Sequence, residues 1–241
     1  MRVIIASDFH LKFAENEDDK RRRQKVEEFL KSLKGSTDVL ILNGDIFDLW
    51  FSWNQVIIKG YFSVLKILSE LKNSGCRIIF IAGNHDFCFN GFLEEEIVNE
   101  VRTDTFTDTI DGLKYFVSHG DSFTTNDLRY KIFRKIIRNG FLMKIFKLVH
   151  PDLSLKIGKL MSRSSRDRVI PEKLKEKKNA GLLREAERQA NSGINVVAFG
   201  HTHNPIKKQL GNCVYVNSGD WIINQSYIEI KDKKTELKYY E

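Results

Sequence analysis

Cysteine is scarce in this chain: its 241 residues include only three, and no two of them form a Cys-x-x-Cys pair. That count argues against a disulfide framework and against a closed zinc site built on thiolates, and it fits a reducing cytosol. No apolar run approaches the roughly 20 residues of a membrane-spanning helix. The first residues, "MRVIIASDFH", turn polar too soon for a signal peptide. We therefore expect a cytoplasmic protein.

Acidic residues are missing from one segment, residues 128–149, which holds seven basic residues and therefore the whole net charge of +7. Of the 39 basic residues, the other 32 balance the 32 acidic ones. Such a concentrated basic segment indicates an anionic partner. The seven are Arg129, Lys131, Arg134, Lys135, Arg138, Lys144 and Lys147.

The same segment carries apolar residues at helical spacing, on either side of an Asn139-Gly140 break. They are Ile132, Phe133, Ile136, Ile137, Phe141, Leu142, Ile145, Phe146 and Val149. A stripe of this kind usually packs on a core while its lysines face water. Here the stripe is rich in aromatic residues and has no acids beside it, which fits an amphipathic hairpin on an anionic membrane surface. Nucleic acid is not an expected partner, because the polar and stacking groups that read bases are absent from it.

Histidine is also scarce, yet five of the six histidines stand in motifs that directly follow short apolar runs. The runs are typical of strands buried on both faces. Their ends read "ASDFH", "LNGD", "AGNHD", "SHGD" and "FGHTH". A single buried histidine is most often a core residue bonded to a backbone carbonyl. Five of them together with aspartates and an asparagine are costly to gather unless a cation balances them, so the sequence predicts a metal centre where these strands end.

The segments between these runs complete an α/β pattern. Residues 20–34, 56–73 and 172–191 have helical periodicity, and their alternation with strands in the first half predicts parallel βαβ units. Carboxyl ends of such strands are where ligands gather. The second half adds three hairpins, with turns at Asp111-Gly112, near Gly211 and near Asp232. No repeat or linker divides the sequence, so we expect one domain spanning residues 1–241.

The candidate ligands supply oxygen and nitrogen but no thiolate, a set that suits Mn²⁺, Fe²⁺, Co²⁺ or Zn²⁺ in open sites. They are too many for one ion. Asp-x-His and His-x-His spacings place both side chains on one side of a strand end. Asp45 could bridge two ions ~3.5–4 Å apart, the arrangement that activates a hydroxide and clamps a phosphoryl group.

The blocks "DFH", "GD", "GNHD", "HGD" and "GHTH", in that order, resemble the five signature blocks of the calcineurin-like metallophosphoesterases. The resemblance covers nearly the whole chain and implies a four-layer α/β/β/α sandwich. It implies two divalent metal ions, which we expect to be Mn²⁺. By position, one ion would be held by Asp8, His10, Asp45 and His203, and the other by Asp45, Asn84, His119 and His201.

The same resemblance implies that His85 faces the substrate, where it donates a proton to the leaving oxygen or stabilises the charged transition state. Asp86 or Asp121 would orient ligands from behind. For Asp48, such an orienting role and an ordinary role at the start of a helix are equally supported.

Three further stretches, "HGDSFTTNDLRYKIFRKIIRN", "HPDLSLKIGKLMSRSSR" and "SGDW", resemble the UDP-2,3-diacylglucosamine pyrophosphatases of lipid A synthesis. In that family a helical cap, here at about 122–180, covers the active site and receives acyl chains. The resemblance implies release of UMP and 2,3-diacylglucosamine 1-phosphate (lipid X) from the UDP-linked acylated glucosamine. It also implies a peripheral position on the cytoplasmic face of the inner membrane. Substrate contacts would come from Asn84, His85, Asp127, Ser165 and His201.

One position departs from that family, whose well-known members read Gly-Asn-Arg-Asp where this chain has Gly-Asn-His-Asp. His85 is the residue of the wider phosphoesterase family. The departure leaves open a divergent branch or another pyrophosphate or phosphodiester substrate. A general metal-dependent phosphodiesterase or nuclease is therefore the alternative. A scaffold without metal would be expected to have lost ligand residues, and all seven are present.

Overall fold

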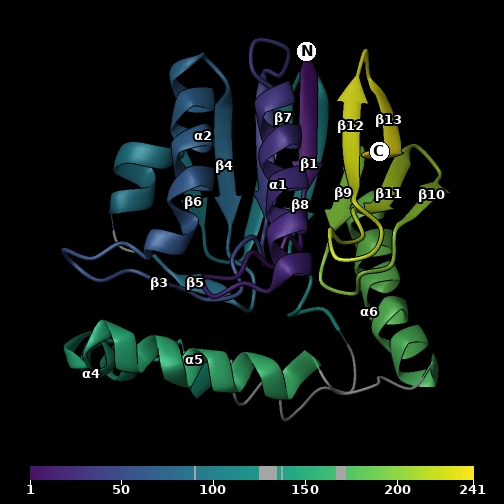
Figure 1. The fold of residues 1–241 in the computed structure, drawn as a ribbon. Helices are drawn as coiled ribbons and strands as arrows, with labels where there is room; N and C mark the ends of the chain where they lie inside the picture. Colours follow the sequence, from purple (N-terminus) through teal and green to yellow (C-terminus); the bar gives the residue numbers. More distant parts are fainter. Residues whose placement is uncertain (90, 125–134, 137, 167–171) are drawn as a thin grey trace.

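The computed structural model describes residues 1–89, 91–124, 135–136, 138–166 and 172–241. Two β-sheets pack against each other, and helices cover their outer faces (Figure 1). The first sheet has the order β13 (Lys234–Tyr239), β12 (Ser226–Lys231), β1 (Arg2–Ala6), β2 (Val39–Asn43), β4 (Arg77–Ile81), β6 (Glu100–Arg102). The second has the order β10 (Ile206–Leu210), β11 (Cys213–Asn217), β9 (Val196–Phe199), β8 (Leu113–Ser118), β7 (Thr105–Ile110).

The predicted βαβ units are confirmed, since β1, β2, β4 and β6 are parallel neighbours. Helix α1 (Glu17–Ser32) connects β1 to β2, and α2 (Phe62–Asn73) precedes β4. Asn16 caps α1 by accepting the amide hydrogen of Asp19. Helix α2 begins later than expected, because three consecutive β-branched residues, Val56 to Ile58, crowd a helical turn and lie before a 3₁₀ turn (Lys59–Tyr61).

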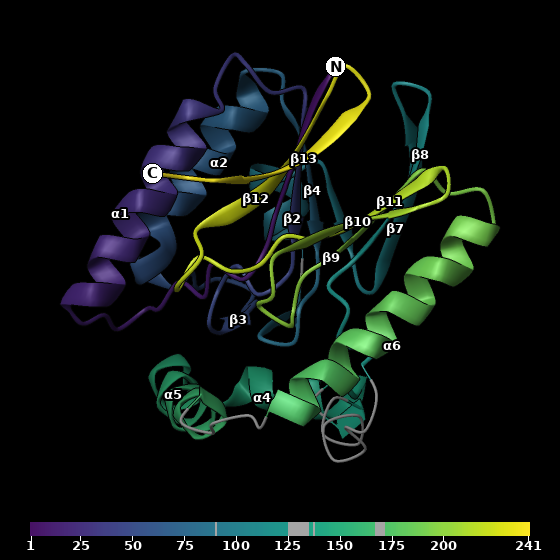
Figure 2. The ribbon, with the colours of Figure 1, turned by 90° about the vertical axis from the view of Figure 1, so that its right-hand side faces the viewer.

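Three apolar clusters separate four layers, in agreement with the α/β/β/α sandwich implied by the sequence (Figure 2). Successive strand residues point to opposite faces. Ile4 therefore packs with the α1 and α2 side, and Ile5 packs between the two sheets. The third cluster joins the second sheet to helix α6 (Glu172–Asn191) through Leu182 and Ala186.

The three predicted hairpins are present, pairing β7 with β8, β10 with β11, and β12 with β13. Asp111 and Gly112 both have positive φ angles, 52° and 76°. That geometry matches the right-handed twist of the strands that it joins. A short parallel pair, β3 (Trp50–Phe51) with β5 (Asp86–Cys88), and a π-helical turn (Leu93–Ile97) were not predicted.

Two helices lie across the end of the sandwich at which β1, β2 and β4 finish (Figure 1): α4 (Gly140–Leu148) and α5 (Pro151–Arg166). Asn139 caps α4, in keeping with the expected break. Gly158 of α5 is packed so closely on Leu49 that a β-carbon there would overlap the leucine side chain. Among the described residues, no helix combines the length and apolar character needed to cross a bilayer. The single domain and the cap limits at about 122–180 stay predictions.

Candidate metal centre

Seven side chains of metal-binding type come together from the loops after β1, β2, β4, β8 and β9. The parallel strands put their carboxyl ends at one edge, so residues far apart in sequence meet there. Six of the seven, together with Asp48 and His85, form three compact groups: Asp8, His10 and His203; Asp45, His119 and His201; and His10, Asp48 and His85. The seventh, Asn84, lies beside the second group.

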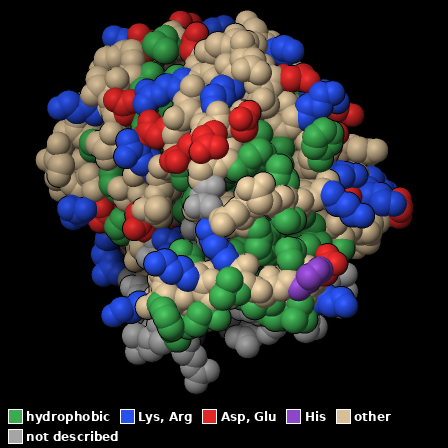
Figure 3. Space-filling view, turned by 90° about the vertical axis from the view of Figure 1, so that its left-hand side faces the viewer, with side chains coloured by type: hydrophobic (Ala, Val, Ile, Leu, Met, Phe, Trp, Pro, Cys, Tyr) green, Lys and Arg blue, Asp and Glu red, His purple; other side chains and the backbone are tan. Residues whose placement is uncertain are grey.

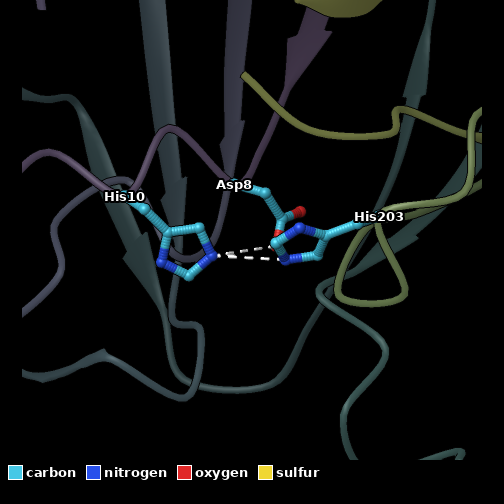
Figure 4. Close-up of side chains that lie close together, drawn as sticks. All are labelled: Asp8, His10 and His203. Carbon is cyan, nitrogen blue, oxygen red and sulfur yellow. Dashed lines mark hydrogen bonds and ion pairs between the residues drawn. The ribbon is translucent and has the colours of Figure 1, made fainter. Parts of the chain in front are cut away.

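The first group surrounds the outer nitrogen of His203, with all three side chains pointing toward one another (Figure 4). His203 Nε2 lies 3.2 Å from Asp8 Oδ1 and 3.3 Å from His10 Nε2. His10 Nε2 is 3.7 Å from Asp8 Oδ1 and also 3.7 Å from Asp45 Oδ2. Four donor atoms therefore face one small space.

The second group surrounds the side-chain oxygen of Asn84. His119 Nε2 lies 3.1 Å from Asn84 Oδ1, and His201 Nδ1 lies 2.9 Å from the same oxygen. His119 Nε2 is also 3.4 Å from Asp45 Oδ2. One oxygen of Asp45 thus faces both groups, as the predicted bridging role of this carboxylate requires.

The donor atoms suit divalent cations. Asp8 Oδ1, which faces the first group, is buried and makes no hydrogen bond to the residues that the structure describes, and buried polar atoms are rarely left so. Burial would raise the pKa values of Asp8 and Asp45, but the facing imidazoles hold both below their usual range. Burial would lower the pKa of His119, yet the Asp45 carboxylate raises it to about 10. The surroundings of His119 Nε2 thus favour a positive charge, and a metal ion bound there would supply that charge in place of a proton.

The backbone at these positions is strained. Five of the seven residues have φ angles in the left-handed region: Asp8 (56°), His10 (45°), Asp45 (53°), His201 (64°) and His203 (54°). For residues with a β-carbon this conformation costs about 1 kcal/mol or more each. Strained backbone of this kind is concentrated at functional sites. Here it lets the chain turn sharply directly after each strand.

Three of the strand ends need glycine, because a β-carbon there would overlap neighbouring atoms. A β-carbon at Gly83 would overlap Asp45, one at Gly44 would lie 2.6 Å from His119 Nδ1, and one at Gly200 would lie 2.5 Å from Ser7 Oγ. The glycine in each motif therefore lets the backbone approach the polar groups of a neighbouring loop.

Of the two residues expected to orient ligands, Asp86 acts through the backbone. Its carboxylate accepts the amide hydrogens of Asp45 (2.9 Å), Ile46 (2.6 Å), Phe47 (3.1 Å) and Gly83 (2.9 Å), so it ties two ligand loops together. Asp121 is buried after β8, and its charge acts on the pKa values of His119 and His201.

Three further orienting groups were missed or undecided from the sequence. The Asn43 carbonyl lies 3.0 Å from His119 Nδ1, and Asp220 Oδ2 lies 3.7 Å from His203 Nδ1. Asp48 Oδ1 lies 3.8 Å from the Nδ1 atoms of both His10 and His85, which favours its orienting role. Asp220 stands in "SGDW" directly after a strand, so the same Gly-Asp signal was available there.

The substrate contacts expected from the sequence lie partly outside the described residues. Asp127 is outside them, and Ser165 lies in α5 but its side chain is not among those described. His85 is beside the first group, with its ring centroid 5.0 Å from that of His10. Its Nδ1 lies 2.9 Å from the Asp48 carbonyl oxygen, and burial lowers its pKa to about 4.

The sequence model of the calcineurin-like phosphoesterases matches residues 1–205, so the chain belongs to that family. It is a metal-dependent hydrolase, and the clusters described above are suited to divalent metal ions.

Among curated proteins, it is 25% identical to a UDP-2,3-diacylglucosamine hydrolase of Porphyromonas gingivalis over 242 residues, covering 94% of this chain and 92% of the relative. It is also 25% identical to a protein of that name from Haemophilus influenzae over 215 residues, covering 88% and 89%. A solved structure described as a novel archaeal phosphodiesterase aligns with a TM-score of 0.50 and 16% identity, covering 99% of both chains. That likeness concerns the fold alone.

Proposed function

We propose that this hydrolase cleaves the pyrophosphate of UDP-2,3-diacylglucosamine, releasing UMP and 2,3-diacylglucosamine 1-phosphate (lipid X). The observation that carries the proposal is the position of two amphipathic helices, α4 and α5, across the edge that holds the candidate metal centre (Figure 1). A substrate with a pyrophosphate and two acyl chains needs both features side by side. The names of the curated relatives support the same substrate.

In this proposal two Mn²⁺ ions occupy the two groups. Asp8, His10, Asp45 and His203 would hold one ion, and Asp45, Asn84, His119 and His201 would hold the other. When bound, the ions supply an activated water and positive charge against the phosphoryl oxygens.

His85 is the residue that acts on the leaving oxygen or on the charged transition state. A carbonyl oxygen only accepts hydrogen bonds, so the contact with Asp48 places a proton on Nδ1. The neutral ring carries none on Nε2, so Nε2 must first take up a proton before it can donate one there. Asn84 and His201 contact the substrate from the second group, while Asp127 and Ser165 contact it from the cap.

An apolar pocket next to the centre supports a place for an acyl chain. It has a volume of about 220 Å³ and is lined mainly by Trp50, Phe51, Trp53, Ile58 and Phe92. The Trp50 amide donates to the His85 carbonyl at 3.1 Å, so one wall of the pocket is tied to the loop that carries His85. Phe51, which lines the pocket, also contacts the cap, because its ring lies 4.9 Å from that of Phe146 in α4.

The outer face of the cap supports docking on an anionic membrane surface. Phe141 is 69% exposed and Leu148 is 87% exposed, with Ile145 between them. On the side of the molecule that is on the left in Figure 1, hydrophobic side chains gather in the lower half, with lysine and arginine side chains near them (Figure 3). Exposed apolar groups beside Lys144 and Lys147 fit a protein held peripherally on the cytoplasmic face of the inner membrane.

The substrate assignment is tested by measuring UMP release from UDP-2,3-diacylglucosamine with Mn²⁺ present, beside hydrolysis of an aryl phosphodiester and of DNA. We expect UMP release that stops when a chelator removes the metal. Cleavage of the aryl phosphodiester or DNA without UMP release would favour the general phosphodiesterase, the alternative suggested by His85.

The role of the cap is tested by comparing how a cap variant hydrolyses the lipid substrate and a soluble substrate. The double variant Phe141→Asn, Ile145→Asn is expected to lower turnover of the lipid substrate by orders of magnitude, since each acyl methylene that loses contact forfeits ~0.8 kcal/mol. Hydrolysis of a soluble aryl phosphodiester should stay at the parent rate. Ile206→Asn, at an apolar position on β10 that is 38% exposed, is the control and should change neither rate. Equal loss of both activities in the double variant would mean that α4 is only part of the core.

A further inference from the structure

Arg138 is one of the seven basic residues of the acid-free segment, but its guanidinium is turned inward. It precedes α4, and its side chain is only 19% exposed. Nη2 donates to the Gly83 carbonyl at 2.9 Å, and Nη1 donates to the Thr103 carbonyl at 3.1 Å. Nη1 also lies 3.4 Å from Asp104 Oδ1. These acceptors belong to the two loops that follow the neighbouring strands β4 and β6.

The contact with Gly83 reaches the centre of the metal site through one peptide group. The Gly83 carbonyl and the Asn84 amide hydrogen belong to the same plane, because they share one peptide bond. That amide donates to Asp45 Oδ1 at 2.8 Å, and the His85 amide donates to the same oxygen at 2.9 Å. The other oxygen of Asp45, Oδ2, is the atom that faces both groups of ligands.

A row of charge-assisted hydrogen bonds therefore runs from the guanidinium through the peptide to the carboxylate. Hydrogen bonds in such a row strengthen one another, since each bond polarises the next. If the guanidinium were removed, the peptide would lose the partner that fixes its plane. Rotation of that plane would withdraw the Asn84 amide from Asp45 and move the Asn84 side chain.

We propose that Arg138 is a positioning residue of the metal centre: it lets the inserted helical segment set the orientation of the Gly83–Asn84 peptide and, through it, of Asp45 and Asn84. The inference rests on the metal groups proposed above but not on the lipid substrate. It gives this segment a second task, separate from any contact with acyl chains. The ion held by Asn84, His119 and His201 depends on it most.

The test compares Arg138→Met, which removes every donor at similar length, with the parent and with Arg138→Lys. Calorimetric titration with Mn²⁺ is expected to show one of two sites weakened by ~10–100-fold in Arg138→Met, the usual effect of losing a group that orients ligands. Amide hydrogen exchange across residues 83–86 should become faster. With a soluble aryl phosphodiester, kcat should fall while KM stays unchanged, and Arg138→Lys should recover part of both losses.

Lys156→Met is the matched control, because it removes one positive charge from an exposed position of α5. It should leave Mn²⁺ affinity, exchange and the aryl phosphodiester rate unchanged. Arg138→Met with parental affinity at both sites would overturn the proposal, even if its thermal stability fell, because Arg138 would then only anchor the segment. Should Arg138→Met fail to fold, parental titration of Arg138→Lys would overturn it equally. Absence of UMP release from the lipid substrate would reject the proposed substrate and leave this inference standing.

Discussion

Replacing Asp45 with alanine is expected to abolish hydrolysis and to weaken the binding of both metal ions. One carboxylate oxygen faces the two groups of donors, at 3.7 Å from His10 Nε2 and 3.4 Å from His119 Nε2. The other accepts the amide hydrogens of Asn84 and His85. Loss of the side chain therefore removes a shared ligand and the anchor of a second loop. Metal content after dialysis and turnover of an aryl phosphodiester measure the two effects.

A second substitution separates charge from shape at this position. Asp45→Asn keeps the size and an oxygen that accepts from the two amides, and asparagine tolerates the left-handed backbone. It should still lose turnover, because a neutral amide is a poor bridge between two cations. Asp18→Ala is the control, since its side chain is 87% exposed on α1. Near-normal turnover with two bound metals in either Asp45 variant would disprove the bridging role.

The second large effect concerns His85. If His85 acts on the reacting phosphate and holds no metal, His85→Ala should keep both ions and substrate affinity while kcat falls by ~10²–10⁴-fold, the range typical of a positioned acid–base group. Metal titration, KM and kcat are measured on the same preparation.

His150→Ala offers a matched control, because His150 is the one histidine outside the strand-end motifs and its side chain is 74% exposed. It should behave as the parent protein. Loss of one ion in His85→Ala would instead make His85 a ligand, together with Asp48 and His10, with which it forms a compact group.

The strands that carry the centre could be predicted because their signals are local. Apolar runs at β1, β2, β4, β8 and β9 are long enough for strands buried on both faces, and each ends at once in polar residues. Because the strands of a parallel sheet run in the same direction, their carboxyl ends then lie at one edge. The gathering of the seven side chains follows from that topology, while their roles as ligands remain predictions.

What could not be predicted depends on contacts between distant segments. Arg138 counts as one more surface charge in its segment, and only the fold brings it to Gly83, 55 residues away. Asp220 reaches His203 in the same way, across a turn whose amides bind its carboxylate. The short β3–β5 pair has too few residues for a periodic signal.

The left-handed backbone at five proposed ligands has an evolutionary consequence. At Asp8, His10, Asp45, His201 and His203, glycine would relieve the strain but would delete a donor atom. Stability and activity therefore favour different residues at the same positions. A library selected for thermal stability alone should drift toward glycine or asparagine at His10, His201 and His203, whereas Asp8 and Asp45 also accept backbone amide hydrogens that glycine would leave unpaired. Keeping histidine at those three positions therefore requires selection for chemistry, because selection for a relaxed fold alone would remove it.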